Sequence, residues 1–397
     1  MGGRRPKAAV IAAAITAVIT VAMIAAVITA AITAGWPSVQ RAKVSAVGDL
    51  MVHQWQLDDA LDSASGEYDF IKSFARVQPY LRSADLTIGN LETVFAGAEA
   101  GYSDYPLFNT PDAFALALRG AGFNFLTTAN NHCCDKNEAG LTRTLDVLDA
   151  LGLDHTGTFR TPEERQSIKI KEAHGIRFAL LSYTYATNGI QLASGGGSVN
   201  TLQRTLVYND IQKAQKMNPD VIIVLPHMGT EYAAAPDEMT RKWTRFMLEA
   251  GADVVLASHP HVLQEMEYVT GIGGDRIGFV DYSLGNFISS QRTLPRDMGV
   301  ILNLYFEKTG RQKAQLKHVS FIPTWVKFVG AKGAYDIQTL SVYDALLSET
   351  DLSRKDRERL KNIHAEITEK YLGRAVPLDQ IQNEYFWPQT TKNKPIK

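Results

Sequence analysis

The stretch FNFLTTANNHCCDKNEAGLTRTLDVLDALGLDHTG, residues 123–157, places a compact polar cluster between an apolar strand and an amphipathic helix. Residues 123–128 have the apolar character of a buried strand, and leucines recur at helical spacing over residues 141–151. In open α/β sheets ligands bind at the carboxyl ends of strands, where this cluster lies. An Asn–His pair there could hold a metal or a phosphate, although an Asn-rich turn capping the next helix explains this stretch alone equally well. The cluster consists of Asn130, Asn131, His132 and Asp135.

Two apolar strands that precede this stretch also end in acidic residues. Asp49 closes the run that begins at Val44, and Asn90 and Glu92 close a second run. His53 follows Asp49 by four residues. An extended chain rises by about 3.3 Å per residue, so a turn would be needed for both side chains to reach one ion. A surface or helix-capping role is the alternative for His53.

Three histidines follow two later strands. His227 follows a continuously apolar run, residues 219–225, of the kind found in buried parallel sheets. His259 and His261 follow the next such run and are separated by Pro260, which restrains the backbone between them. Two imidazoles presented in this way suit two adjacent metal ions. We therefore expect oxygen and nitrogen donors from several strand ends to meet in one pocket.

The order of these motifs resembles that of the calcineurin-like dinuclear metallophosphoesterases. Within that superfamily, the sequences of these motifs are similar to those of the CapA/PgsA family of poly-γ-glutamate capsule biosynthesis proteins, over about residues 44–288. The resemblance implies an α/β fold, a four-layer αββα sandwich with its metal site at the strand ends, preceded by one transmembrane helix. The segments that carry the resemblance are GDLMVH, GNLE, TTANNHCCDKNEAGLTRTLDVL, PHMGTEY, SHPHVLQ and YSLGNF.

The resemblance also implies a pair of divalent ions, Mn, Zn or Fe, held by two ligand sets with a bridging carboxylate. Asp49 and His261 would hold one ion, and Glu92 would bridge the two. His132 would be the general acid of a hydrolytic reaction. The second ion would be held by Asn131, His227 and His259, and the roles of His53, Asn90 and Asp135 stay open.

The sequence departs from the superfamily pattern at three positions. The usual first motif is Asp-x-His, but the histidine nearest to Asp49 is His53, so one ion would lack a ligand. The bridging residue is usually Asp, and Glu92 reaches one methylene further. Cys133 stands where an acid usually follows Asn-His. Cys133 and Cys134 are adjacent, which disfavours ordinary disulfide geometry, and we expect two small buried side chains rather than soft ligands.

The amino-terminal segment has the pattern of a membrane anchor. Residues 8–34 are uncharged and apolar, long enough to span a bilayer, and they follow Arg and Lys residues. A signal peptide has a shorter apolar region of roughly 7–15 residues, so we expect a retained single-pass anchor with the rest of the chain outside the cytoplasm; cleavage is the alternative. The predicted parts are an anchor (1–35), a linker (36–43), a metallophosphatase-like domain (44–325) and a C-terminal helical extension (326–397).

The net charge limits the classes of partner that we expect, and two functions stay open. The 397 residues carry a net charge of -1, which gives no reason to expect a nucleic-acid partner. The first function is an accessory role in capsule synthesis or export, binding anionic polymer beside membrane-embedded polyglutamate synthase subunits. The second is a surface hydrolase acting on phosphoester or γ-glutamyl amide bonds. The sequence lacks a G-x-x-x-x-G-K-[ST] loop, so we do not expect ATP-dependent polymerisation on this chain.

Overall fold

The computed structural model describes most of the chain beyond the amino-terminal segment. The predicted anchor over residues 1–35 lies outside the described residues except for 19–23 and 25. No helix within the described residues is long and apolar enough to cross a membrane, so the anchor stays a prediction. The described residues are 19–23, 25, 38–192, 197–274, 276–331 and 334–388.

The larger sheet of the described chain has nine strands, and its central strands are parallel. Its order is β16-β15-β14-β1-β2-β3-β4, and β13 and β17 pair with β1 and β15. Strands β1 to β4 are parallel to one another, whereas β14, β15 and β16 are antiparallel. The strands are β1 (Val39–Leu50), β2 (Leu86–Leu91), β3 (Phe125–Thr127), β4 (Asp154–Thr156), β13 (Asn286–Ile288), β14 (Met298–Thr309), β15 (Gln315–Ala331), β16 (Ala334–Ser341) and β17 (Tyr385–Trp387).

A second sheet of six strands has the order β11-β12-β10-β9-β7-β6, with β7, β9, β10 and β12 parallel. Its strands are β6 (Lys169–Ala173), β7 (Ile176–Thr184), β9 (Val221–His227), β10 (Val254–Leu256), β11 (Met266–Val269) and β12 (Gly278–Asp281). Strands β6 and β7 form an antiparallel hairpin that turns at His174 and Gly175. A short antiparallel pair is formed by β5 (Thr158–Phe159), which precedes β6 in the chain, and β8 (Ser198–Val199), which lies between β7 and β9.

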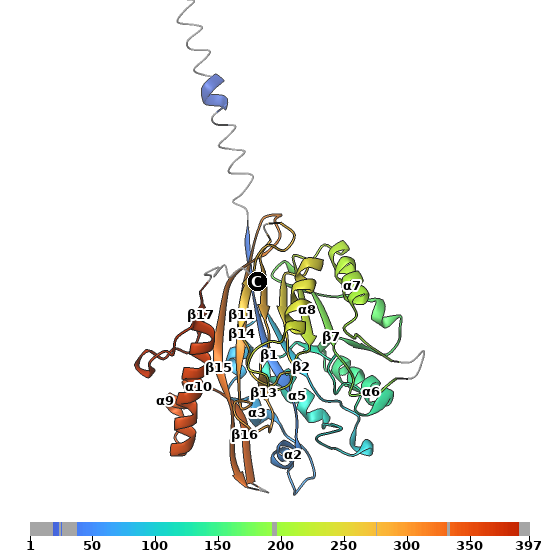
Figure 1. Cartoon of the computed structure of the whole chain (residues 1–397), viewed down its shortest axis with the longest axis vertical. Coiled ribbons are helices and arrows are strands. Elements are labelled where there is room, and N and C mark those ends of the chain that lie inside the picture. The colour runs from blue at the N-terminus through green and yellow to red at the C-terminus, as the bar shows by residue number, and fades with distance from the viewer. Residues whose placement is uncertain are drawn as a thin grey trace, which may run out of the picture.

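Helices flank both sheets (Figure 1). The apolar side of each amphipathic helix faces a sheet, as its spacing of buried residues requires. The α-helices are α2 (Gln54–Ala60), α3 (Ile71–Phe74), α4 (Gln78–Leu81), α5 (Asp112–Ala121), α6 (Asn137–Ala150), α7 (Arg204–Lys216), α8 (Glu238–Ala250), α9 (Val342–Ser348) and α10 (Arg354–Leu372). Three short 3₁₀ helices are η1 (Ala98–Ala100), η2 (Glu164–Gln166) and η3 (Leu378–Gln380).

The buried apolar side chains form layers between these elements. One core joins the facing sides of the two sheets, with Val44 of β1 and Ile223 of β9 among its members. A second core lies between the larger sheet and helices α3 and α5, and a third lies between the smaller sheet and helices α7 and α8. The predicted α/β class is therefore confirmed, and the two sheets pack against each other between outer helices.

The segment after residue 325 continues the larger sheet. Strand β15 runs through the predicted boundary between residues 44–325 and 326–397, and its second half pairs with β16. The boundary is therefore wrong, because β15 is long enough to pair with β14 and then β16. Within the predicted helical extension, α10 begins after Ser353, whose side chain accepts from the Asp356 N–H. In Figure 1, α9 and α10 lie at the edge of the molecule.

The predicted linker over residues 36–43 also differs from the structure. Strand β1 begins at Val39, which is opposite Thr309 of β14. The two strands pair from this point onward. Residues 39–43 belong to the sheet because the long hairpin of β14 and β15 offers them a partner, which the local sequence does not reveal.

The close approach of Gly48 to Gly285 generates a stability prediction. A Cβ on Gly48 would lie 1.8 Å from the Gly285 carbonyl oxygen, which also accepts the Asp49 N–H at 3.0 Å. We predict that Gly48→Ala lowers the free energy of unfolding by about 1–3 kcal/mol or more, because β1 must shift. Urea denaturation measures the change. Gly120→Ala in α5, where a Cβ meets nothing within 4 Å, should be neutral or stabilising. Equal stabilities of the two variants would contradict the close approach.

Candidate metal centre

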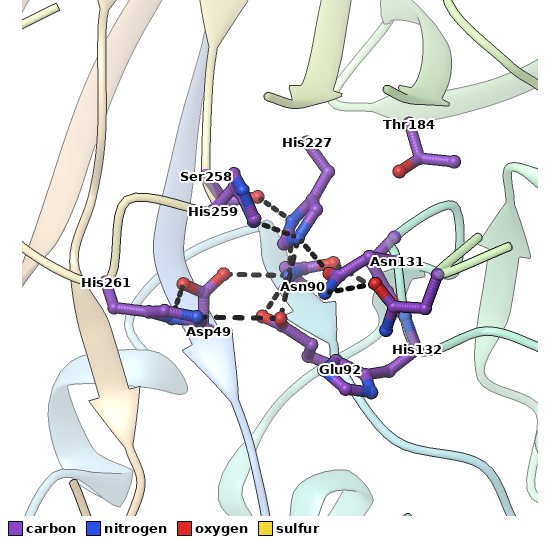
Figure 2. A network of polar contacts seen from close by, with 12 residues as sticks. Asp49, Asn90, Glu92, Asn131, His132, Thr184, His227, Ser258, His259 and His261 are labelled. Atoms are coloured by element: carbon purple, nitrogen blue, oxygen red, sulfur yellow. Dashed lines mark hydrogen bonds and ion pairs between the residues drawn. The ribbon is translucent and has the colours of Figure 1, made fainter. Parts of the chain in front are cut away.

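Side chains from the carboxyl ends of both sheets converge on one buried pocket (Figure 2). Asp49 and Glu92 come from the ends of β1 and β2, and His227 is the last residue of β9. Asn90 lies within β2, and the loops after β3 and β10 supply the rest. All the predicted donors except His53 are at most 4% exposed, so solvent does not satisfy them. These residues are Asp49, Asn90, Glu92, Asn131, His132, Asp135, His227, His259 and His261.

A bulge in β1 turns Asp49 into the pocket. Strand β1 pairs Ala46 with Ile88 of β2, but it pairs Asp49 with Asn90, so β1 has one extra residue between these pairs. If residues 46–49 alternated regularly, without the bulge, Asp49 would lie on the face opposite Ala46. A bulge re-aims a side chain in this way. The register shift therefore explains how an acid at this strand end meets donors from the other sheet.

One set of donors has the spacing of ligands to a single ion. The His227 Nε2 lies 2.8 Å from the Asn131 Oδ1 and 3.1 Å from the His259 Nδ1. Ligand atoms that each lie 2.0–2.2 Å from one ion are roughly 3 Å apart. The His227 Nδ1 lies 3.0 Å from the Ser258 Oγ and 3.2 Å from the Asn90 Nδ2, and the tautomer that donates from Nδ1 to the serine hydroxyl leaves Nε2 free to bind a cation. These three residues are close enough to share one ion, and their assignment to one ligand set stays a prediction.

A second set surrounds His261. Its Nδ1 lies 3.0 Å from the Asp49 Oδ2 and 3.1 Å from the Asn286 Oδ1, so this nitrogen carries the proton and donates it. The Nε2 is left to face the Glu92 Oε1 at 3.9 Å. A carboxylate that accepts from one imidazole nitrogen orients the ring and makes the other nitrogen a better ligand. Asp49 therefore orients the His261 ring, and their binding to one common ion stays a prediction.

Glu92 is common to both sets. Its Oε1 is buried and has no hydrogen-bond partner among the described residues, although it lies 3.5 Å from the His227 Nε2. A buried carboxylate oxygen left without a partner is costly, and a cation would satisfy it. Possible ligand atoms lie within 4.8 Å of one another in two groups, Glu92 with His259 and His261, and Glu92 with Asp49 and His227. The residues present therefore fit divalent ions.

Asn90 positions the two carboxylates. Its Oδ1 accepts from the Thr127 Oγ1 at 3.3 Å and from the Asn130 Nδ2 at 3.2 Å, which fixes the orientation of the amide. The Nδ2 consequently faces the acids and donates to the Asp49 Oδ1 at 2.8 Å and the Glu92 Oε2 at 3.2 Å. Because its oxygen points away from them, Asn90 holds the carboxylates rather than joining them as a ligand.

His132 and Asp135 form a pair at the side of the pocket. The His132 Nδ1 lies 2.8 Å from the Asp135 Oδ2, and the same oxygen accepts the Phe108 N–H at 2.7 Å. The Phe108 ring also packs edge-on against the imidazole, with ring centroids 4.7 Å apart. The acid and the phenyl ring fix the orientation of His132 and leave its Nε2 available. A general acid needs such an orientation.

His53 belongs to neither group of possible ligands. It is the residue before α2, its N–H donates to the Gln56 Oε1 at 3.0 Å, and its Nδ1 accepts the Ser290 N–H at 3.3 Å. Burial lowers its pKa to about 4, so the ring is neutral. The helix-capping alternative therefore describes His53, because the chain turns into α2 directly after Val52 instead of turning back toward Asp49.

The two cysteines lie beside the pocket without joining it. Cys133 and Cys134 are buried, their Sγ atoms are 3.7 Å apart, and they pack with Leu141 and Leu145 of α6. Neither belongs to a group of possible metal ligands. Their burial agrees with the expected packing role.

The electrostatics of the pocket follow from burial and from the acids. Burial lowers the pKa of His227 and His259 to about 3, so both are neutral. Burial also opposes the charge on His261, but Glu92 and Asp49 outweigh it and raise its pKa to about 9. Burial and the charge of Asp49 raise the pKa of Glu92 well above its ordinary value. For Asp49, the interaction with His261 outweighs burial and lowers the pKa to about 2.

The loop after β10 is strained where it presents its histidines. His259 has a φ of 107° and His261 has a φ of 59°, both in the left-handed region. Such conformations cost on the order of 1–3 kcal/mol each for a non-glycine residue and occur mainly at functional sites. The Pro260 restraint was visible in the sequence, but this strain was not.

Two contributors were missing from the sequence prediction. Ser258 contacts the His227 Nδ1, and Asn286 contacts the His261 Nδ1. Asn286 lies in the YSLGNF segment after Gly285, whose φ is +67°. That segment was already part of the family resemblance, and it was the available signal for Asn286.

Comparison with known proteins identifies a family whose model matches this chain. The model of the family described as bacterial capsule synthesis protein PGA_cap matches residues 43–291. The capsule biosynthesis protein CapA of Bacillus anthracis is 28% identical over 261 residues, 64% of this chain and 61% of that protein. The PGA biosynthesis protein CapA of Bacillus subtilis (strain 168) is 27% identical over 271 residues, 67% of this chain and 68% of that protein. The match thus spans less than two thirds of the B. anthracis protein.

Solved structures with a similar arrangement are distant. A 5'-nucleotidase precursor from Thermus thermophilus has a TM-score of 0.40 and 12% identity, covering 84% of this chain and 59% of that one. The calcineurin-like phosphoesterase YfkN from Bacillus subtilis has a TM-score of 0.38 and 12% identity, covering 84% of this chain and 98% of that one.

The protonation of the metal-free pocket generates a pH prediction. Near neutral pH, His261 holds a proton because the neighbouring acids Glu92 and Asp49 raise its pKa to about 9. A cation needs deprotonated ligands, so we predict that Mn²⁺ uptake releases protons and that its apparent affinity rises as pH approaches the His261 pKa of about 9. Calorimetric titrations in buffers of different ionisation enthalpy measure this release.

The control is His53→Asn, which keeps a residue able to cap α2 outside the pocket. It should release the same number of protons as the wild-type chain. Binding heats that do not depend on the buffer would contradict the assigned protonation.

Proposed function

Because the chain belongs to the bacterial capsule synthesis protein family PGA_cap, we propose that it serves poly-γ-glutamate capsule synthesis or export and holds two divalent ions, Mn, Zn or Fe. The observation that carries the metal part is the buried Glu92 Oε1, which has no hydrogen-bond partner among the described residues and is common to both ligand groups. The capsule part rests on the family and on its two Bacillus relatives.

The residues of this pocket would hold and orient a pair of ions. Bound there, divalent ions would polarise a phosphoryl or carbonyl oxygen of a substrate and offset its developing negative charge. Asp49 keeps the His261 Nδ1 proton in place, and Asn90 holds both carboxylates. The Asn131 Oδ1 and the nitrogens of His227 and His259 would supply the second ligand set.

We place this site outside the cytoplasm, at the cell membrane. The apolar run of residues 8–34 would be a single-pass anchor, with its preceding positive residues on the cytoplasmic side. The chain would then work beside membrane-embedded polyglutamate synthase subunits and bind their anionic polymer. The sequence lacks a phosphate-binding loop for ATP, which favours a division of labour in which other subunits polymerise.

A second candidate function is hydrolysis of a phosphoester or γ-glutamyl amide bond at the cell surface. The pairing of His132 with Asp135 favours it, because the acid fixes the Nδ1 side of the ring and leaves Nε2 to donate a proton. The Asp135 carboxylate is itself held by the Phe108 N–H, which fixes the position of this pair. The donated proton would go to the leaving oxygen or nitrogen.

The shared carboxylate generates a prediction about metal content. We predict that the wild-type chain binds two equivalents of divalent metal, and that Glu92→Gln binds one or fewer, because the amide oxygen carries no charge to share between two ions. Elemental analysis after dialysis against Mn²⁺ or Zn²⁺ measures the stoichiometry. Glu265→Gln, which alters an exposed carboxylate paired with Arg241, should retain two. One equivalent or less in the wild-type chain would contradict a two-ion site.

The two functions predict different results with polymer. We expect the metal-loaded chain to bind poly-γ-glutamate without shortening it, and His132→Ala to bind equally well, because binding does not use the proton of His132. Size-exclusion chromatography of the polymer, together with a phosphodiester assay, measures both properties.

The exposed His318→Ala on β15 serves as the matched control. Metal-dependent turnover that falls by about 10²–10⁴-fold in His132→Ala but not in His318→Ala would favour the hydrolase instead.

A further inference from the structure

Three partly exposed tyrosines lie beside the buried histidines. Tyr105 is 70% exposed, Tyr185 is 44% exposed and Tyr232 is 42% exposed. Their ring centroids lie 6.3 Å from His132, 4.5 Å from His259 and 5.9 Å from His261, respectively. The rings thus lie between the buried donors and solvent. Any substrate that reaches the metal centre along this side must pass them.

Arg296 lies against one of these tyrosines. Its guanidinium carbon is 3.3 Å from the centroid of the Tyr232 ring, a close cation–π contact. Within the described residues, no carboxylate forms an ion pair with this guanidinium, whereas Arg241 and Arg359 each have one. Arg296 is also only partly buried, so its N–H groups are available to a ligand.

The positions of both residues are tied to the loop that carries the metal-binding histidines. The Tyr232 N–H donates to the Pro260 carbonyl at 2.8 Å, and Tyr232 itself has a φ of 65°. The Arg296 carbonyl accepts from the Asn286 Nδ2 at 3.0 Å, and the Oδ1 of the same amide contacts the His261 Nδ1. One intervening residue therefore connects each member of the pair to the metal centre, which fixes their position beside it.

Arg292, on the same loop, provides a contrast. Its guanidinium lies 4.8 Å from the Phe328 ring centroid, and its Nη1 donates to the Val326 carbonyl at 3.3 Å. Burial lowers its pKa, and the acid that opposes this effect most is Asp297 rather than a group of the metal centre. Of the two arginines, Arg296 is the one that stacks beside His261. Glu231 is an acidic neighbour of the Tyr232 hydroxyl, but it is exposed and forms no ion pair with Arg296 within the described residues.

We propose that Arg296, supported by the Tyr232 ring, binds an oxyanion of the substrate and so selects anionic molecules for the metal centre. This inference rests on the proposed function, in which the substrate is a γ-linked glutamate chain with one free α-carboxylate on each residue. A guanidinium matches a carboxylate or a phosphate with two parallel N–H groups, which an ammonium group does not do. Carboxylate is therefore the expected ligand, and phosphate shares its chemistry.

The test compares the affinities of the metal-loaded full-length chain and its variants for three probes. The probes are a γ-glutamyl hexamer, the same hexamer with its carboxylates converted to amides, and phenyl phosphate, each followed by calorimetry. We expect Arg296→Gln to weaken hexamer binding by about 10–100-fold, as the loss of a charge-assisted hydrogen-bond pair requires. Arg296→Lys should recover only part of the affinity, and Tyr232→Leu should weaken binding several-fold. Wild type and Arg296→Gln should bind the amide hexamer with the same affinity.

Arg292→Gln is the matched control, because it removes the same charge from the same loop, and its affinity should equal that of the wild type. Unchanged hexamer and phosphate binding in Arg296→Gln would overturn the subsite, whatever the function of the chain. So would a wild-type chain that binds neither oxyanion, or a loss of bound metal in Arg296→Gln. If the wild type binds phenyl phosphate but not the hexamer, and Arg296→Gln loses that binding, the subsite stands and the polymer function fails.

Discussion

The burial of Glu92 between two sheets is the constraint on which the centre depends. Its carboxylate is surrounded by another acid and by imidazoles, and one of its oxygens has no hydrogen-bond partner among the described residues. A protein of this size is stable by only about 5–15 kcal/mol, so an unpaired buried charge is a large cost. Without a cation, a proton on His261, whose pKa is raised to about 9, offsets part of this cost. Binding of divalent ions displaces that proton, so ion binding and folding stability are coupled.

The fold meets this constraint with local irregularities at the ends of regular strands. The extra residue in β1 aims Asp49 inward, and the contact between Gly48 and Gly285 brings β1 against the segment that carries Asn286. The left-handed backbone of His259 and His261 directs two imidazoles from one short loop. Each irregularity costs stability on its own, and the packed sheets on either side of the pocket supply the compensating burial.

The sequence allowed the positions of the donors to be predicted, but not all of their roles. Donors at the ends of apolar strands could be located because strand burial is a local pattern, and parallel strands gather their carboxyl ends at one edge. The role of His53 depends on the chain entering α2 at once, and Asn286 reaches His261 only through tertiary packing. The pairing of β15 with β16 likewise joins segments whose helical surroundings suggested a separate extension.

The arrangement of charged groups also bears on which ligands this centre would bind. Without metal, the innermost groups are two acids, the neutral imidazoles of His227 and His259, and a protonated His261, so the interior offers an anionic polymer no net positive charge. The groups nearer to solvent are tyrosines and Arg296, which suit an anion. An anionic ligand therefore meets favourable charge at the mouth whether or not ions are bound, but favourable charge in the interior only when they are. Metal loading would then determine how deeply a polymer chain enters the site. Shallow binding would suit a surface that carries polymer, whereas deep binding would suit a site that cleaves it.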